Sequence, residues 1–172
     1  MTALSSKQNK VLRRMAMLAT AAGLAWSVAA QAQTQPFGQG FDGWSFTATK
    51  EKSGVVNCRA TRKAGGREDI LAYRNDNHTY ISVKAEGRKG KWPKTIVRIP
   101  GKPPGQMEWK VDAGADGGRM WFIVDSSAIS EIAAVGRFEW SLTDTEDSAI
   151  VNLGKRTADA WERVNQCFVK NT

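Results

Sequence analysis

Few side chains in this 172-residue sequence could catalyse a reaction. His78 is the only histidine, and Glu108, Asp112 and Glu139 are the carboxylates from which an acid–base pair of the glycosidase kind would be drawn. Their spacing does not specify such a pair. The chain contains neither a Gly-x-Ser-x-Gly nor a His-Glu-x-x-His motif. The sequence therefore predicts no catalytic residue and a non-enzymatic protein.

Asp112 and Asp116, with the glycines around them, match part of a calcium-binding loop. The Asp-x-Gly-x-Asp-Gly pattern fits at three positions, but Ile123 stands where the loop needs a bidentate glutamate. A hairpin turn at Asp116-Gly117-Gly118 explains the same residues. We expect no metal ligand and no cofactor.

The most distinctive local feature is a basic segment between residues 84 and 102, in which Glu86 is the only acid. Its candidate binding residues are Lys84, Arg88, Lys89, Lys91, Trp92, Lys94, Arg98 and Lys102. If this segment is a flexible loop, it would bind the phosphate or sulfate groups of a lipopolysaccharide, an anionic glycan or a nucleic acid. Trp92 would stack on the rings of such a ligand. The alternative is a solvated loop whose lysines keep a sheet edge from aggregating.

Two cysteines, Cys58 and Cys167, lie near opposite ends of the chain. An even cysteine count at such positions in an oxidising compartment is typical of a disulfide. Ligands at metal-site spacing and a base to activate a thiol are both missing from the sequence. A disulfide between Cys58 and Cys167 is therefore predicted.

The first 32 residues have the order of a secretory signal peptide. Four basic residues precede an apolar run of roughly 14 residues, which ends at the small-x-small pattern Ala30-Gln31-Ala32. The run is shorter than the roughly 20 residues that span a bilayer. Arg13-Arg14 leaves both the general secretory and the twin-arginine routes open. We expect a periplasmic or secreted protein whose mature chain has no transmembrane segment, so nucleic acid is the least expected ligand.

Charge is unevenly distributed along the remaining residues. The net charge is +8 over residues 33–102 and −4 over residues 103–172. Such a split yields a two-faced surface only if the two halves do not interleave in the fold.

Alternating apolar residues and frequent turn signals predict about nine short strands and two short helices. One helix follows Asp125 and ends before Gly136, and the other begins near Thr157 and carries Cys167. The predicted fold is mainly β, an antiparallel sandwich or barrel-like domain with two short helices, one of them C-terminal. Residues 33–40 are expected to form a flexible lead-in and residues 41–172 a single β-rich domain.

Six tryptophans follow the predicted cleavage site. Five of them, Trp44, Trp109, Trp121, Trp140 and Trp161, occupy alternating strand positions or the helix stripe, which predicts that they belong to the core. Trp92, within the basic segment, is the exception.

The layout resembles the invasion-associated locus B family of small periplasmic proteins. The resemblance rests on Gly43-Trp44 after the signal, Cys58, the stretch Val97-Arg98-Ile99-Pro100-Gly101, the short helix after Asp125 and a late strand before the terminal segment. That family usually carries a close cysteine pair after its tryptophan, which this chain lacks. The resemblance implies a β-sandwich and a role at the bacterial surface or in host contact.

These observations favour an exported binding protein that acts at the cell envelope or in host interaction. Its expected partner is an anionic macromolecule, such as a glycan, or an envelope or host protein. The alternative is a periplasmic inhibitor or assembly factor that acts on another protein through a rigid loop such as Pro100–Gly105. An enzyme of unrecognised type is the third hypothesis.

Overall fold

The computed structural model describes residues 32–74 and 78–172. The predicted signal peptide, residues 1–32, lies outside the described residues except for its last position. The described part contains ten strands and two helices. The strands are β1 (Gln33–Pro36), β2 (Trp44–Lys50), β3 (Val56–Ala64), β4 (Arg67–Arg74), β5 (His78–Lys84), β6 (Lys89–Arg98), β7 (Glu108–Asp116), β8 (Arg119–Ile123), β9 (Arg137–Ser141) and β10 (Ser148–Asn152); the helices are α1 (Ser126–Val135) and α2 (Thr157–Asn171).

All described strands join one sheet in the order β1-β2-β3-β4-β5-β8-β7-β6-β9-β10, and every pairing among them is antiparallel. Short hairpins connect most neighbours, as the turn signals predict. The connection through α1 carries the chain from β8 to β9, on the other side of β6 and β7. The prediction of a mainly antiparallel β fold with two helices, the second C-terminal, is confirmed.

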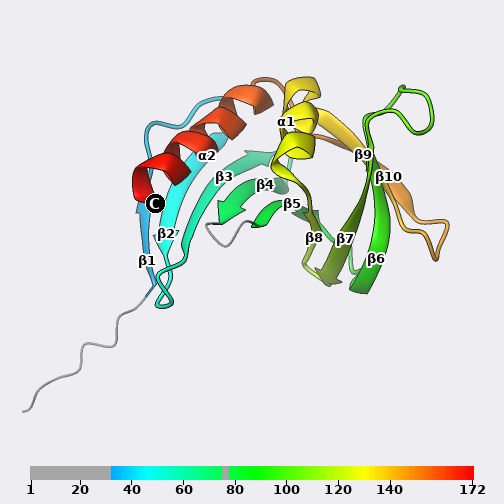
Figure 1. The fold of residues 1–172 in the computed structure, drawn as a ribbon, viewed down its shortest axis with the longest axis horizontal. Helices are drawn as coiled ribbons and strands as arrows, with labels where there is room; N and C mark the ends of the chain where they lie inside the picture. The colour runs from blue at the N-terminus through cyan, green and yellow to red at the C-terminus, as the bar shows by residue number, and fades with distance from the viewer. Residues whose placement is uncertain (1–31, 75–77) are drawn as a thin grey trace, which may run out of the picture.

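The sheet is strongly bent, and its two helices lie along one side of it (Figure 1). The bend brings β9 opposite β8, because the Phe122 ring lies 5.6 Å from that of Phe138 and 6.0 Å from that of Trp140. Inward residues of both ends of the sheet therefore share one core. The layer is barrel-like but open, since β1 and β10 are its two edges.

Helix α2 is fixed to β3 and β4 by a disulfide and by stacked rings. Cys58 of β3 is bonded to Cys167 of α2, as predicted, and both are buried. Next to this bond the Tyr73 ring stacks on Phe168 at 4.0 Å and on Trp161 at 6.2 Å. The apolar stripe predicted for the terminal helix is thus the face that packs on the sheet.

The segment predicted to be a flexible lead-in is instead part of the sheet. Gln33–Pro36 forms edge strand β1, which pairs with β2, and Phe37 packs against the core. Two cations lie over nearby rings: Lys170 of α2 over Phe37 at 5.7 Å, and Arg156, which precedes α2, over Phe41 at 4.1 Å. Polar composition suggested disorder, but cation–π contacts and strand pairing order this segment.

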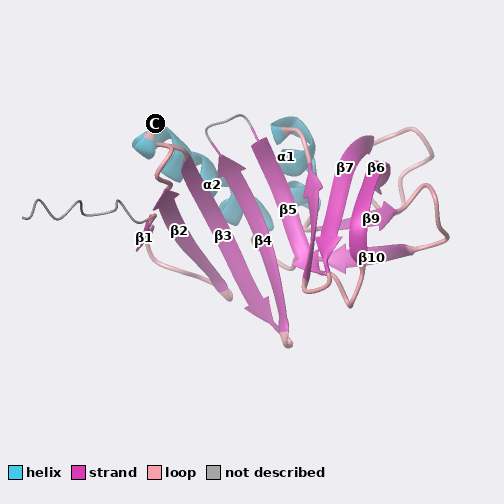
Figure 2. Cartoon of the chain, turned by 90° about the horizontal axis from the view of Figure 1, so that it is seen from below, coloured by secondary structure: helices cyan, strands magenta, loops and turns pink. Residues whose placement is uncertain are grey.

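One face of the sheet lacks a helix. Viewed from below, the strands β3, β4 and β5 lie in front of both helices (Figure 2). Cys58 and Tyr73 point to the helix side, so their strand neighbours Arg59 and Arg74 point to the opposite side. We call this opposite side the helix-free face. Its side chains come from β3, β4, β5, β8, β7 and β6, and no helix covers them.

Replacing both cysteines with alanine should lower the free energy of unfolding by about 2–4 kcal/mol, because the bond closes a long loop in the unfolded chain. Alanine keeps the buried sites apolar. Urea denaturation of the two proteins measures the difference, and reductant should lower the stability of the wild type only. A double variant as stable as the oxidised wild type would contradict the proposed stabilisation.

Candidate functional site

The basic segment predicted to be a binding loop is mostly a strand. Lys84 ends β5, a tight turn follows, and Lys89–Arg98 is β6, paired with β7. The register shifts between Trp92 and Thr95, and Pro93, which has no N–H to donate, lies within this bulge. The loop prediction is therefore wrong for residues 89–95, which belong to an irregular strand.

The two arginines of this segment bind acids from the second half of the chain. Arg88 Nε lies 3.2 Å from Asp147 Oδ2, and its guanidinium lies over the Trp140 ring. Arg98 Nη2 lies 2.6 Å from Glu139 Oε1, and this hydrogen bond raises the pKa of Arg98. These guanidinium groups tie strands together.

The remaining members of the segment do not form one site. Lys84, Lys89, Lys91, Lys94 and Lys102 are exposed, and none has an ion pair with another described residue. The Trp92 side chain is half-buried and packs against the core, whereas Lys89 and Lys91 lie on the opposite side of β6. The predicted combination of lysines with a stacking Trp92 is therefore not assembled.

A groove on the helix-free face is the better candidate site. A hollow of about 440 Å³ has a floor that includes Ile70, Tyr80, Trp121 and Ile123, with charged side chains around it. A second hollow of about 460 Å³ shares Trp121 and Ile123 with the first. We call these two hollows together the sheet groove. Apolar floors with a few polar groups are typical of ligand sites.

Trp121 lies in the centre of the sheet groove because of a glycine on the next strand. Gly114 of β7 is its register partner, and a Cβ atom at Gly114 would lie 2.8 Å from Trp121 Cζ2. The indole therefore lies directly across Gly114. The core prediction is wrong for Trp121, which is half-exposed on the helix-free face. It is confirmed for Trp44, Trp140 and Trp161, which are buried, and Trp109 is half-buried against the core.

Arg119, at one side of the first hollow, is fully engaged within the protein. Its Nε donates to Ser82 Oγ at 2.9 Å and its Nη1 to Glu68 Oε1 at 3.1 Å. Its Nη2 donates to the Glu68 and Ser82 carbonyl oxygens. Arg119 thereby joins β8 to β5 and β4, and it fixes one wall of the groove.

Arg59 is the guanidinium of the hollow that is best placed to meet a ligand. Arg74 is paired with Glu51, with 2.9 Å between Nη1 and Oε1. Arg59 Nε donates to Asn57 Oδ1 at 3.3 Å, and among the described residues no acid pairs with Arg59. Asn57 in turn donates to the Tyr80 hydroxyl at 3.4 Å, which orients both lining side chains.

The carboxylates considered for catalysis are not assembled into an acid–base pair. Glu108 and Glu139 lie on either side of Arg98, at its register positions on β7 and β9. Asp112 lines the second hollow, and His78 lines the first at the start of β5. Among residues 32–74 and 78–172, no group of three or more histidine, cysteine or acidic side chains is arranged to hold a metal ion.

Asp116 forms the turn that the sequence predicts. Its Oδ1 accepts from the backbone N–H groups of Arg119 and Gly118, at 2.8 and 2.9 Å, and these bonds lower the pKa of its carboxyl. The carboxylate is therefore committed to the hairpin between β7 and β8.

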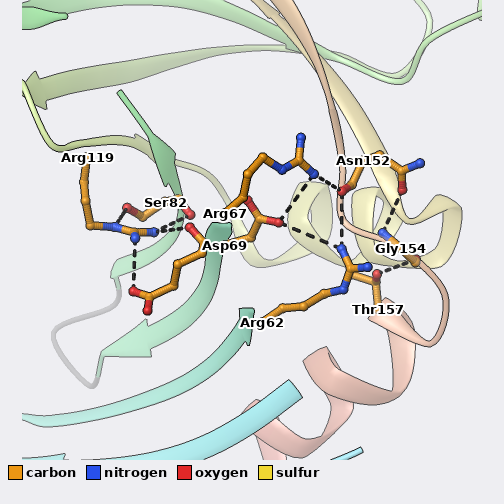
Figure 3. Close-up of polar contacts among 9 residues, drawn as sticks. Arg62, Arg67, Asp69, Ser82, Arg119, Asn152, Gly154 and Thr157 are labelled. Atoms are coloured by element: carbon orange, nitrogen blue, oxygen red, sulfur yellow. Dashed lines mark hydrogen bonds and ion pairs between the residues drawn. The ribbon is translucent and has the colours of Figure 1, made fainter. Parts of the chain in front are cut away.

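A polar cluster around the buried Asp69 lies on the opposite side of the sheet from the groove and links β3 and β4 to β10, which closes the bent sheet (Figure 3). Asp69 of β4 lies 3.9 Å from Arg67 and 4.0 Å from Arg62, and both arginines donate to the Asn152 carbonyl at the end of β10. Burial raises the pKa of the Asp69 carboxyl above its ordinary 3.8, although the arginines oppose that shift. The sequence offered no signal for this cluster, because its members come from three separate strands.

No helix in the described part of the chain has the length and apolarity needed to cross a membrane.

Comparisons with known proteins leave the chain without a family. No family model matches it, and no curated protein or solved structure does so either. The resemblance to the invasion-associated locus B family therefore stays a prediction from the sequence pattern.

Replacing Asp69 with asparagine tests which effect dominates at the buried cluster. A carboxyl with a raised pKa binds its proton more tightly in the folded state, so its contribution to stability is complete below pH 3.8 and declines as the pH rises through the folded-state pKa. The wild type should therefore gain stability relative to Asp69→Asn as the pH falls from 7 towards 4.

Urea denaturation at several pH values measures this difference, with Asp144→Asn, in an exposed turn, as the control. The control should follow the wild type more closely. If acidification instead cost the wild type more stability than Asp69→Asn, the ion pairs with Arg62 and Arg67 would outweigh the burial of the charge.

Proposed function

We propose that this protein is an exported, non-enzymatic binding domain that recognises an anionic macromolecule through the sheet groove. The observation that carries this proposal is the position of Trp121, whose half-exposed indole lies on Gly114 in the same hollow as Arg59. An indole face stacks on flat or ring-shaped groups, and a guanidinium binds carboxylate, sulfate or phosphate with two hydrogen bonds. Export is supported by the signal-peptide pattern and by the disulfide.

The exposed lysines of β5 and β6 support the same proposal, Lys91 as a lining residue of the second hollow and the others from a greater distance. Lys84, Lys89 and Lys91 surround the helix-free face without ion pairs to other described residues. Their field attracts a polyanion and increases its rate of association, even where they make no direct contact. Binding should therefore weaken as salt is added.

The second candidate function is that of an inhibitor or assembly factor directed at another protein. It is favoured by the loop between β6 and β7, which extends from the sheet at the upper right of Figure 1. The loop carries Pro100–Gly105 and ends at Met107, whose side chain is 38% exposed and whose φ is +50°. Recovery of one stoichiometric protein partner, lost on deletion of residues 102–105, would favour this function.

Dextran sulfate and uncharged dextran separate charge recognition from sugar stacking, because the two polymers share a backbone. The purified protein should bind dextran sulfate far more tightly, and Trp121→Ala should weaken that binding about ten-fold, equivalent to roughly 1.4 kcal/mol. Isothermal titration at two salt concentrations measures both effects. Equal affinity for the two polymers would refute recognition of an anion.

A glycine pair provides the matched control for the position of the indole. Gly114→Ala should displace Trp121 and weaken binding, because the new Cβ would lie 2.8 Å from the ring. Gly118→Ala, in the adjacent hairpin, would meet only Asp116 Oδ1 at 3.6 Å and should bind as the wild type does. Thermal denaturation checks that both variants are folded. If both variants bind equally well, the groove is not the site.

A further inference from the structure

We propose, on the basis of the function above, that the ligand is a glycan chain in which an acidic ring and a neutral ring alternate. The two hollows of the sheet groove would hold neighbouring rings, with Trp121 between them. This proposal specifies the class of ligand, and it follows from a difference in the polar groups that each hollow offers to a ligand: Arg59 in the first, and Lys91 with the exposed Asp112 in the second.

The two hollows form one track across the sheet. The first extends from Arg59 on β3 to Trp121 and Ile123 on β8, and the second extends from these two residues to Lys91 on β6. Their volumes, about 440 and 460 Å³, each lie in the range of small-ligand sites. An extended chain lying across the strands would contact both hollows, whereas a single small molecule would fill only one.

The first hollow suits a negatively charged ring. Arg59, Arg74 and Arg119 line it, and the one lining acid, Asp116, is committed to its own turn. Because Arg74 and Arg119 are paired with glutamates, Arg59 is the group that would bind the ligand's acidic group directly.

The second hollow suits a neutral ring. One cation, Lys91, and one acid, Asp112, line it, so its formal charges balance. Asp112 is exposed and has no ion pair with another described residue. Its carboxylate can accept hydrogen bonds from sugar hydroxyls, and Lys91 can donate one. A second acidic ring would meet the like charge of Asp112. A polymer charged at every unit, dextran sulfate included, should therefore bind less tightly than an alternating chain of the same length, although more tightly than a neutral one.

Three tetrasaccharides distinguish the charge patterns. A hyaluronan tetrasaccharide alternates acidic and neutral rings, tetragalacturonate is acidic at every ring, and chitotetraose is neutral throughout. Isothermal titration should give the tightest binding for hyaluronan, by about ten-fold over each of the others.

Two conservative variants test the two hollows separately. Arg59→Gln should weaken hyaluronan and tetragalacturonate binding and leave chitotetraose unaffected. Asp112→Asn should weaken hyaluronan binding and improve that of tetragalacturonate, because it removes a like charge. Glu131→Gln, exposed on α1, is the control and should change none of these affinities. Circular dichroism confirms that each variant is folded.

The outcomes separate this inference from the proposed function. Equal binding of hyaluronan and tetragalacturonate, or an Asp112→Asn variant with unchanged preferences, refutes the proposal that the ligand is an alternating glycan. Neither result contradicts recognition of an anion. Equal binding of chitotetraose overturns recognition of an anion as well. If neither dextran sulfate nor any tetrasaccharide binds, both proposals fall.

Discussion

The attachment of α2 to β3 determines which face of the sheet is buried. The Cys58–Cys167 bond and the Tyr73–Phe168 stack hold the helix against one side of the sheet. An antiparallel sheet needs only one covered face, and the other can remain in contact with solvent. The opposite face is therefore left to its own side chains, and there Trp121 lies across Gly114. The candidate site is a consequence of how the core is closed.

The bend of the sheet also determines what the charge asymmetry of the sequence becomes. Basic residues of the first half meet acids of the second, as in Arg88–Asp147 and Arg98–Glu139. The two halves interleave, so much of the basic excess is used in ion pairs between strands and turns. Guanidinium groups of this kind position elements, whereas the unpaired lysines and Arg59 provide the field outside the protein.

Much of the fold could be predicted from local patterns, but little of the site could. Alternation identified most strands, because it depends on residues that are close in sequence. The disulfide could be predicted because the chain has only two cysteines to pair. Residues 120–124 are all apolar, so the sequence does not show which of them face the core. Only the strand alternation that buries Met120, Phe122 and Val124 would have placed Trp121 on the outward side. The first part of β6, residues 89–95, was missed because Pro93 lies in a bulge, and bulges depend on the neighbouring strand. The Asp69 cluster joins residues from three strands and has no local signature.

Stability and binding make opposite demands on the helix-free face. A tryptophan opposite a glycine stabilises a sheet by covering exposed backbone, and that role alone requires no cations nearby. The groove also contains Arg59, which has no acidic partner among the described residues, and Asp112, which is exposed. The other two arginines that line the first hollow, Arg74 and Arg119, are paired with acids. A face built only for stability would be expected to pair Arg59 in the same way. A guanidinium without an acidic partner among the described residues, in the same hollow as the Trp121 indole, therefore argues for a ligand.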